Sequence, residues 1–163
     1  MSGILGFPNP VNEKAARVVA GVVLTAAVVI LATGWLWLLV PLAYGFWARV
    51  LTGPKLSPVG WLAQNKVAPR LGAPRRVPGP PKRFAQGIGA ALTTAAALLA
   101  LVAGAATAAY VLVALLAVAA GLESIFGLCL GCQAFALLMR AGIVPERVCE
   151  ECADIWSRRT AST

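Results

Sequence analysis

The sequence predicts an all-α, polytopic membrane protein with four transmembrane helices, arranged as two related hairpins and followed by a short tail that contains cysteines. Its 163 residues are 60% apolar and only 12% charged, about half the charged share of an ordinary soluble domain. Two long stretches, 18–48 and 84–139, contain a single charged side chain between them, Glu123. The basic residues gather between these stretches, as in a loop that joins two membrane hairpins.

The first hairpin is expected over residues 15–51. A helix needs roughly 17 to 25 residues to cross the hydrocarbon, so two helices fit here only if they are short and joined at "TGW", residues 33–35. Trp35, Trp37 and Trp47 lie near the ends of these helices, where tryptophan anchors a span at the headgroup level. The apolar run is too long for a secretory signal peptide and lacks its cleavage site.

The second hairpin is expected over residues 84–128, with a turn near "LVAGAAT". Its beginning aligns with that of the first hairpin at a shift of 68 residues, which pairs Gly21 with Gly89 and Thr25 with Thr93. The alignment suggests a duplicated hairpin.

The basic loop 52–83 determines the expected topology. It and its flanks carry eight cationic residues and no acidic one: Arg49, Lys55, Lys66, Arg70, Arg75, Arg76, Lys82 and Arg83. By the positive-inside rule, we expect the loop and both termini in the cytoplasm and the protein in the inner membrane. Anionic lipid headgroups are the expected partner of this loop. Nucleic acid is not expected, because topology already explains the net charge of +8.

Within that loop, Ser57 and Pro58 predict the start of a short helix. The stretch "GAPRRVPGPPKR" is expected to have no regular structure, because of its prolines and glycines.

Residues 129–141 are expected to form an interfacial segment, which completes a membrane domain over 1–141, and residues 142–163 form the tail. In the alternative topology, Ser124 to Arg140 is a fifth span and the tail is exported. Gly127 and Gly131 let helices approach closely. We expect this to serve packing within the chain, with a homo-oligomer as the alternative.

Successive segments of the chain, "NPVNEKAARVVAGVVL", "SPVGWLA", "PKRFAQGIG" and "LESIFGLCLGC", resemble the integral membrane family of domain of unknown function 4395. Members of this type carry a C-x-x-C at the end of the last transmembrane helix. Genes of the family often lie beside rhodanese and thioredoxin-like genes. The resemblance therefore implies sulfur or thiol traffic, with a thioredoxin-like or rhodanese partner, and it implies no established activity.

All four cysteines fall in two C-x-x-C units, Cys129 with Cys132 and Cys149 with Cys152, separated by sixteen residues. This spacing is typical of four-thiolate zinc sites, which would attach the tail to the end of the fourth helix. The alternative is thiol or persulfide exchange, with Cys129 as the nucleophile and Cys132 as its partner. Acidic residues beside the tail pair disfavour a thiolate there. A third interpretation gives the four thiols no common role.

Glu123 is the one acidic residue in the apolar stretch 84–139. An acidic side chain inside a membrane is costly to bury, so it suggests a functional role. Six residues before Cys129, it is not on the same helix face, so it reaches that thiol only through water or a bend. The simpler expectation is that Glu123 reaches the interface or pairs with Arg49.

The chain contains no histidine, which excludes haem ligation and hydrolytic triads. We expect a zinc-stapled membrane scaffold or adaptor, and an enzyme acting alone is not expected. A thiol relay is the first alternative, and a small transporter of sulfur species or metal is the second.

Overall fold

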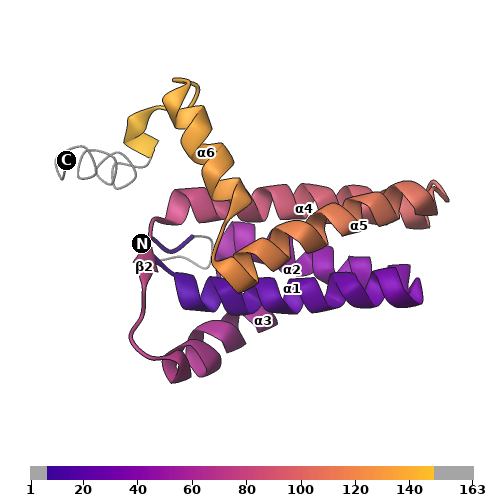
Figure 1. Ribbon diagram of the computed structural model, residues 1–163, viewed down its shortest axis with the longest axis horizontal. Helices are drawn as coiled ribbons and strands as arrows, with labels where there is room; N and C mark the ends of the chain where they lie inside the picture. Colours follow the sequence, from indigo (N-terminus) through magenta and orange to yellow (C-terminus); the bar gives the residue numbers. More distant parts are fainter. Residues whose placement is uncertain (1–6, 149–163) are drawn as a thin grey trace.

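Four apolar helices run side by side as a bundle in the computed structural model, which describes residues 7–148 (Figure 1). They are α1 (Glu13–Thr33), α2 (Leu39–Thr52), α4 (Gly79–Leu101) and α5 (Ala106–Gly121). Two shorter helices lie outside the bundle, α3 (Pro58–Leu62) and α6 (Leu130–Arg140). The prediction of a mostly helical chain is confirmed.

Within residues 7–148, three helical stretches are long and apolar enough to cross a membrane: Glu13–Thr33, Gly79–Leu101 and Ala106–Phe126. The third includes η4 (Leu122–Phe126), a π-helical turn that continues α5. α2 and the 3-10 turn before it, η1 (Leu36–Leu38), form a shorter apolar stretch, Leu36–Thr52. Large apolar side chains such as Val28, Leu98 and Val118 cover the outside of the bundle, where lipid rather than water would stabilise them.

Both predicted hairpin turns are present. α1 ends at Thr33, and Gly34 follows in the left-handed conformation with φ of 72°, which glycine adopts without a steric penalty. α4 ends at Leu101 and α5 begins at Ala106, with Gly104 between them at φ of 67°. The aligned threonines make the same hydrogen bond in the two hairpins: Thr25 donates to the carbonyl of Gly21, and Thr93 to that of Gly89.

The basic loop contains more regular structure than predicted. The helix that begins after Ser57 is present as α3, and the Ser57 hydroxyl accepts a hydrogen bond from the Gly60 amide at 3.2 Å. Two further turns continue it, the π-helical η2 (Ala63–Val67) and the 3-10 helix η3 (Ala68–Leu71).

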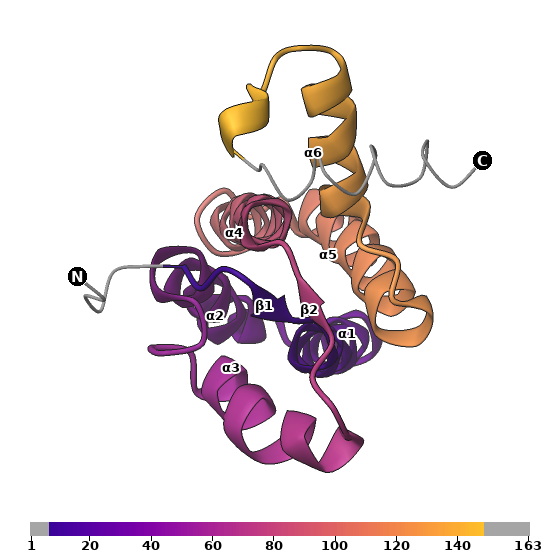
Figure 2. The same cartoon turned by 90° about the vertical axis from the view of Figure 1, so that its left-hand side faces the viewer.

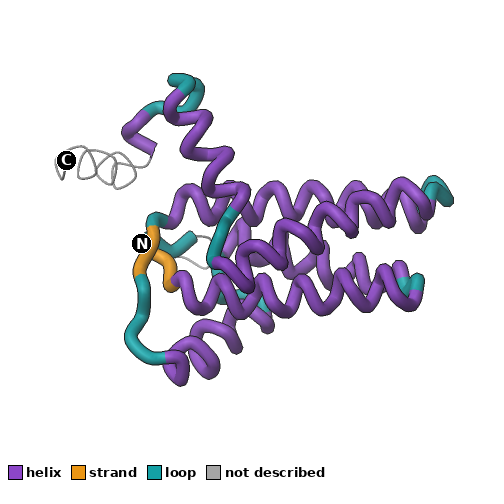
Figure 3. The backbone as a smooth tube through the Cα atoms, in the orientation of Figure 1, coloured by secondary structure: helices purple, strands orange, loops and turns teal. Residues whose placement is uncertain are grey.

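The expectation of no regular structure in "GAPRRVPGPPKR" is wrong. β2 (Arg76–Val77) pairs antiparallel with β1 (Val11–Asn12), just before α1 (Figure 3). α4 then begins at Gly79, earlier than the predicted residue 84, because prolines are tolerated in the first turn of a helix. The strand pair thus holds the starts of α1 and α4 together at one end of the molecule, here called the strand end.

Helices of different hairpins pack on one another. α2 packs against α4, α4 against α5, and α5 against α1, as the view along the bundle shows (Figure 2). The α2 and α4 contact is close because the Phe46 ring fills the space that a side chain at Gly89 would need. Ile30, Leu39 and Val113 are buried between the helices toward the hairpin turns. Each hairpin therefore completes the core of the other.

Candidate functional site: a cysteine pair beside a buried ion pair

Cys129 and Cys132 lie just beyond the end of the fourth helical stretch, at the beginning of a further helix, α6, which was not predicted. The helical stretch ends at Phe126, and the chain bends at Gly127, which has φ of 69°. Cys129 then caps α6 in an extended conformation, and its sulfur accepts a hydrogen bond from the Cys132 amide at 3.3 Å. The motif thus lies where a helix presents unpaired amides and a partial positive charge.

Arg17 of α1 holds the turn between α5 and α6. Its Nε and one terminal nitrogen donate to the carbonyl of Ser124 at 3.2 and 3.1 Å, and the same terminal nitrogen donates to the carbonyl of Ile125 at 2.8 Å. Carbonyls at the end of a helix have no partner within it. Arg17 therefore satisfies them and fixes the segment that leads to the cysteines.

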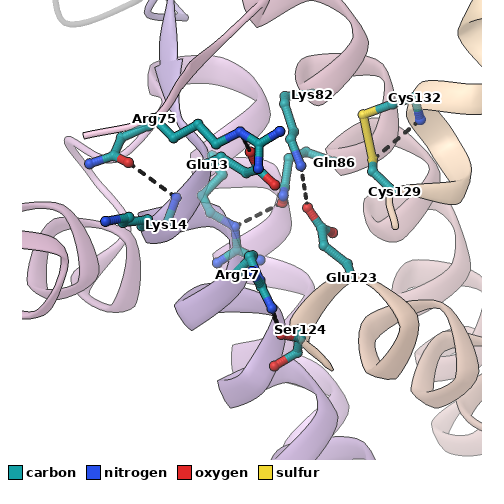
Figure 4. A network of polar contacts seen from close by, with 12 residues as sticks. Glu13, Lys14, Arg17, Arg75, Lys82, Gln86, Glu123, Ser124, Cys129 and Cys132 are labelled. Carbon is teal, nitrogen blue, oxygen red and sulfur yellow. Dashed lines mark hydrogen bonds and ion pairs between the residues drawn. A yellow bond between two sulfur atoms is a disulfide. The ribbon is translucent and has the colours of Figure 1, made fainter. Parts of the chain in front are cut away.

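The two cysteines are joined by a disulfide (Figure 4). Cys129 is 9% exposed, and Cys132 is half-buried on the first turn of α6. Gly131 between them faces α4, and a Cβ at this position would lie 2.5 Å from the Cβ of Ala85. The glycine of the "CLGC" sequence thus brings the cysteine pair close to α4.

Glu123 forms an ion pair with Lys82 of α4, with 2.6 Å between the carboxylate oxygen and Nζ (Figure 4). Their side chains are only 15% and 8% exposed. The expectation that Glu123 pairs with Arg49 is therefore wrong. Lys82 reaches it because α4 begins before this residue and carries it into the bundle.

Arg49 has other partners. Its Nε donates to the side-chain oxygen of Gln86 at 2.9 Å, and another guanidinium nitrogen donates to the hydroxyl of Ser57 at 3.2 Å. The guanidinium also lies over the Phe46 ring, 4.6 Å from its centroid. Arg49, Lys82 and Glu123 are thus enclosed together at the strand end of the bundle.

Sequence reasoning missed Lys82, Gln86 and Ser57 as parts of this polar cluster. Lys82 was assigned to the loop, since its place inside α4 depends on where that helix begins. Gln86 gave a detectable signal, because an amide at the third residue of a predicted membrane helix requires a hydrogen-bond partner.

A cavity of about 360 Å³ lies between α1, α2, α4, α5 and α6. Glu123, Gln86 and Cys129 contribute to its lining, and the other lining side chains are apolar, among them Phe46 and Leu116. Glu123 and Cys129 thus border one space although they are not on one helix face. The bend at Gly127, one of the two routes by which Glu123 was expected to reach the thiol, accounts for this arrangement.

The predicted four-cysteine zinc site stays a prediction. Within residues 7–148, no group of three or more histidine, cysteine or acidic side chains is placed to hold a metal. Cys149 and Cys152 lie outside the described residues.

The apolar helices, with charged groups confined to one end, define a multi-pass membrane protein. Residues 11–140 match the domain of unknown function DUF4395, and the chain belongs to this family. The resemblance seen in the sequence is thereby confirmed. No curated protein and no solved structure matches the chain.

Proposed function

We propose that this protein is a thiol exchange protein of the membrane, in which Cys129 and Cys132 alternate between dithiol and disulfide. The observation that carries the proposal is the position of the motif at the beginning of α6, an 11-residue helix. A helix N-terminus stabilises a thiolate, and a thiolate is the species that attacks disulfides and takes up sulfur. The Cys132 amide, which donates to the Cys129 sulfur, supports that thiolate directly.

The exchange proceeds in two displacements. The Cys129 thiolate attacks one sulfur of a substrate disulfide, which forms a mixed disulfide and releases the other sulfur as a thiolate. Cys132 then loses its proton and attacks Cys129, so that the substrate leaves as a second thiolate. The substrate disulfide gains two electrons, and the cysteine pair loses two. We assign the acceptance of the thiol proton to the carboxylate of Glu123, which lines the same cavity as Cys129.

In the disulfide form, a thiolate of a protein partner attacks the sulfur of Cys132, because this residue is half-buried whereas Cys129 is 9% exposed. Cys129 then leaves as the thiolate that the helix N-terminus stabilises. We propose a thioredoxin-like protein or a sulfurtransferase as that partner. The resemblance implies the same class of partner, because genes of this family often lie beside genes for thioredoxin-like proteins and rhodaneses.

The proposal includes four spans, with the strand end and the C-terminus in the cytoplasm. α6 has 11 residues, too few for the roughly 17 that a span requires, and it leans away from the bundle (Figure 1). The basic residues Lys66, Arg70 and Arg76 are exposed at the strand end, whereas the hairpin turns carry no charge. Positive charge favours the cytoplasmic side.

A redox titration of the purified protein in lipid nanodiscs tests the proposed exchange. Cys149 and Cys152 are replaced by serine so that only the first pair reports, and thiols are trapped with a maleimide of known mass. We expect one two-electron transition with a midpoint more oxidising than about −300 mV, since exchange proteins lie above this value. Cys129→Ser and Cys132→Ser should each abolish the transition.

Two outcomes contradict the proposal. A pair that stays oxidised well below about −300 mV would be a structural disulfide. One equivalent of zinc in the protein with all four cysteines, with thiols that alkylate only after a chelator is added, would favour the metal site instead.

A further inference from the structure

The cavity beside Cys129 is built for an apolar ligand with a polar group at one end. Its volume of about 360 Å³ lies in the lower part of the range for small-molecule pockets, roughly 300 to 1,000 Å³. Polar side chains are confined to the strand end, where Glu123 and Gln86 lie. Toward the middle of the bundle the walls are apolar, with Leu92 and Leu116 among them.

The cavity reaches the outer surface of the bundle at three apolar side chains. Ile88 of α4, Leu115 of α5 and Leu130 of α6 line it, yet they are 38%, 55% and 42% exposed. An opening with apolar edges on a membrane bundle faces lipid, so a ligand would enter from the hydrocarbon. Cys129 lines the same cavity.

We propose that this cavity binds the ring of a lipid-soluble quinone, which oxidises Cys129 and Cys132 to their disulfide. The inference rests on the proposed exchange function and names its small-molecule substrate. Oxidation of a dithiol removes two electrons and two protons, and a quinone takes up both in becoming a quinol. The side-chain amide nitrogen of Gln86, whose oxygen accepts a hydrogen bond from Arg49, is a donor at the polar end of the site for a ring oxygen.

The two cysteines and the quinone together account for all the electrons and protons of the reaction. The Cys129 thiolate adds to a ring carbon, which forms a carbon–sulfur bond and moves an electron pair onto a ring oxygen. The Cys132 thiolate then attacks the Cys129 sulfur, so that the disulfide forms, the carbon–sulfur bond breaks and its electron pair remains on the ring. The two thiol protons end on the two ring oxygens. The position of Glu123 on the cavity suits it to carry the proton of Cys129.

The test uses the full-length protein in nanodiscs, with Cys149→Ser and Cys152→Ser, reduced and held without oxygen. Decylubiquinone is the probe, because its fully substituted ring reacts slowly with free thiols. We expect one quinone to be consumed per cysteine pair, and the loss of the ultraviolet absorbance of the quinone measures this consumption. Ala119→Phe should slow this oxidation by about tenfold or more, since Ala119 lines the cavity and a larger side chain displaces the ring from the sulfur.

Ala114→Phe is the matched control, because it makes the same change at an exposed position of α5 and should keep the wild-type rate. Equal rates in the wild type and both variants, or oxidation that persists in Cys129→Ser, would overturn the quinone site. Oxidation by glutathione disulfide is measured on the same samples. A pair that titrates with glutathione but ignores the quinone defeats only this inference, whereas a pair inert to both defeats the proposed function as well.

Discussion

At the scale of single residues, the ion pair of Lys82 and Glu123 places two opposite charges inside the bundle. Both side chains are nearly enclosed, and their charged atoms are 2.6 Å apart. A buried ion pair adds little compared with apolar residues of the same size, but removal of one partner leaves an uncompensated charge. The pair thus makes the bundle dependent on both residues at once.

Lys82→Met should therefore destabilise the protein by about 3 to 5 kcal/mol, because Glu123 remains buried without its partner. The double variant Lys82→Met, Glu123→Leu should recover most of this loss. Circular dichroism, recorded while the protein unfolds in detergent, measures the loss and its recovery.

Arg75→Met is the control for this experiment. Arg75 also forms an ion pair, with Glu13 at 2.9 Å; the side chain of Glu13 is 12% exposed but that of Arg75 is 75% exposed. Solvent at Arg75 screens this pair, so the loss of Arg75 should cost less than the loss of Lys82, whose pair is enclosed on both sides. Equal effects of Lys82→Met and Arg75→Met would show that burial of the first pair has no energetic importance.

At the scale of elements, the sequence predicted those features that depend on neighbouring residues. Gly34 and Gly104 mark the hairpin turns, and Ser57 with Pro58 marks the start of α3, because caps and left-handed turns require particular residues locally. The pairing of β1 with β2 was missed, since Val11 and Val77 have no local pattern that links them. The beginning of α6 was missed because the apolar run continues across Gly127 without a change in composition.

The contact of α6 with α4 depends on Gly131. Gly131→Ala should destabilise the protein by about 1 to 3 kcal/mol, the usual cost of overpacking, since the new Cβ would lie 2.5 Å from Ala85. It should also move Cys129 away from α4 and speed its alkylation by maleimide in the reduced protein.

Gly87→Ala is the matched control on α4, because nothing lies within 4 Å of a Cβ at that position. It should be neutral or slightly stabilising, since alanine favours a helix by up to about 1 kcal/mol over glycine. Thermal unfolding and the rate of alkylation are measured on both variants. Unchanged values for Gly131→Ala would contradict the close packing of α6.

At the scale of the whole molecule, the two hairpins are interlocked, and this could not be predicted from composition. The sequence indicates which helices are joined by tight turns, but not that α2 packs on α4 and α1 on α5. Those contacts depend on matched shapes, such as the Phe46 ring over Gly89. The same interlocking brings Lys82, Glu123 and Arg49 together from three helices, which explains why the polar cluster was only partly predicted.

The proposed orientation of this molecule in the membrane rests on its charge distribution and can be measured directly. Alkaline phosphatase fused after Thr163 should be inactive, and the same enzyme inserted at Gly104 should be active. Phosphatase folds only outside the cytoplasm, and the positive-inside rule predicts that the basic strand end stays inside. Strong activity of the fusion after Thr163 would replace the four-span topology with the five-span one. Neutral residues at Lys66, Arg70 and Arg76 should reduce the difference between the two fusions. These three side chains are exposed, so their loss tests the charge rule, whereas changes at Arg75 or Lys82 would also break ion pairs.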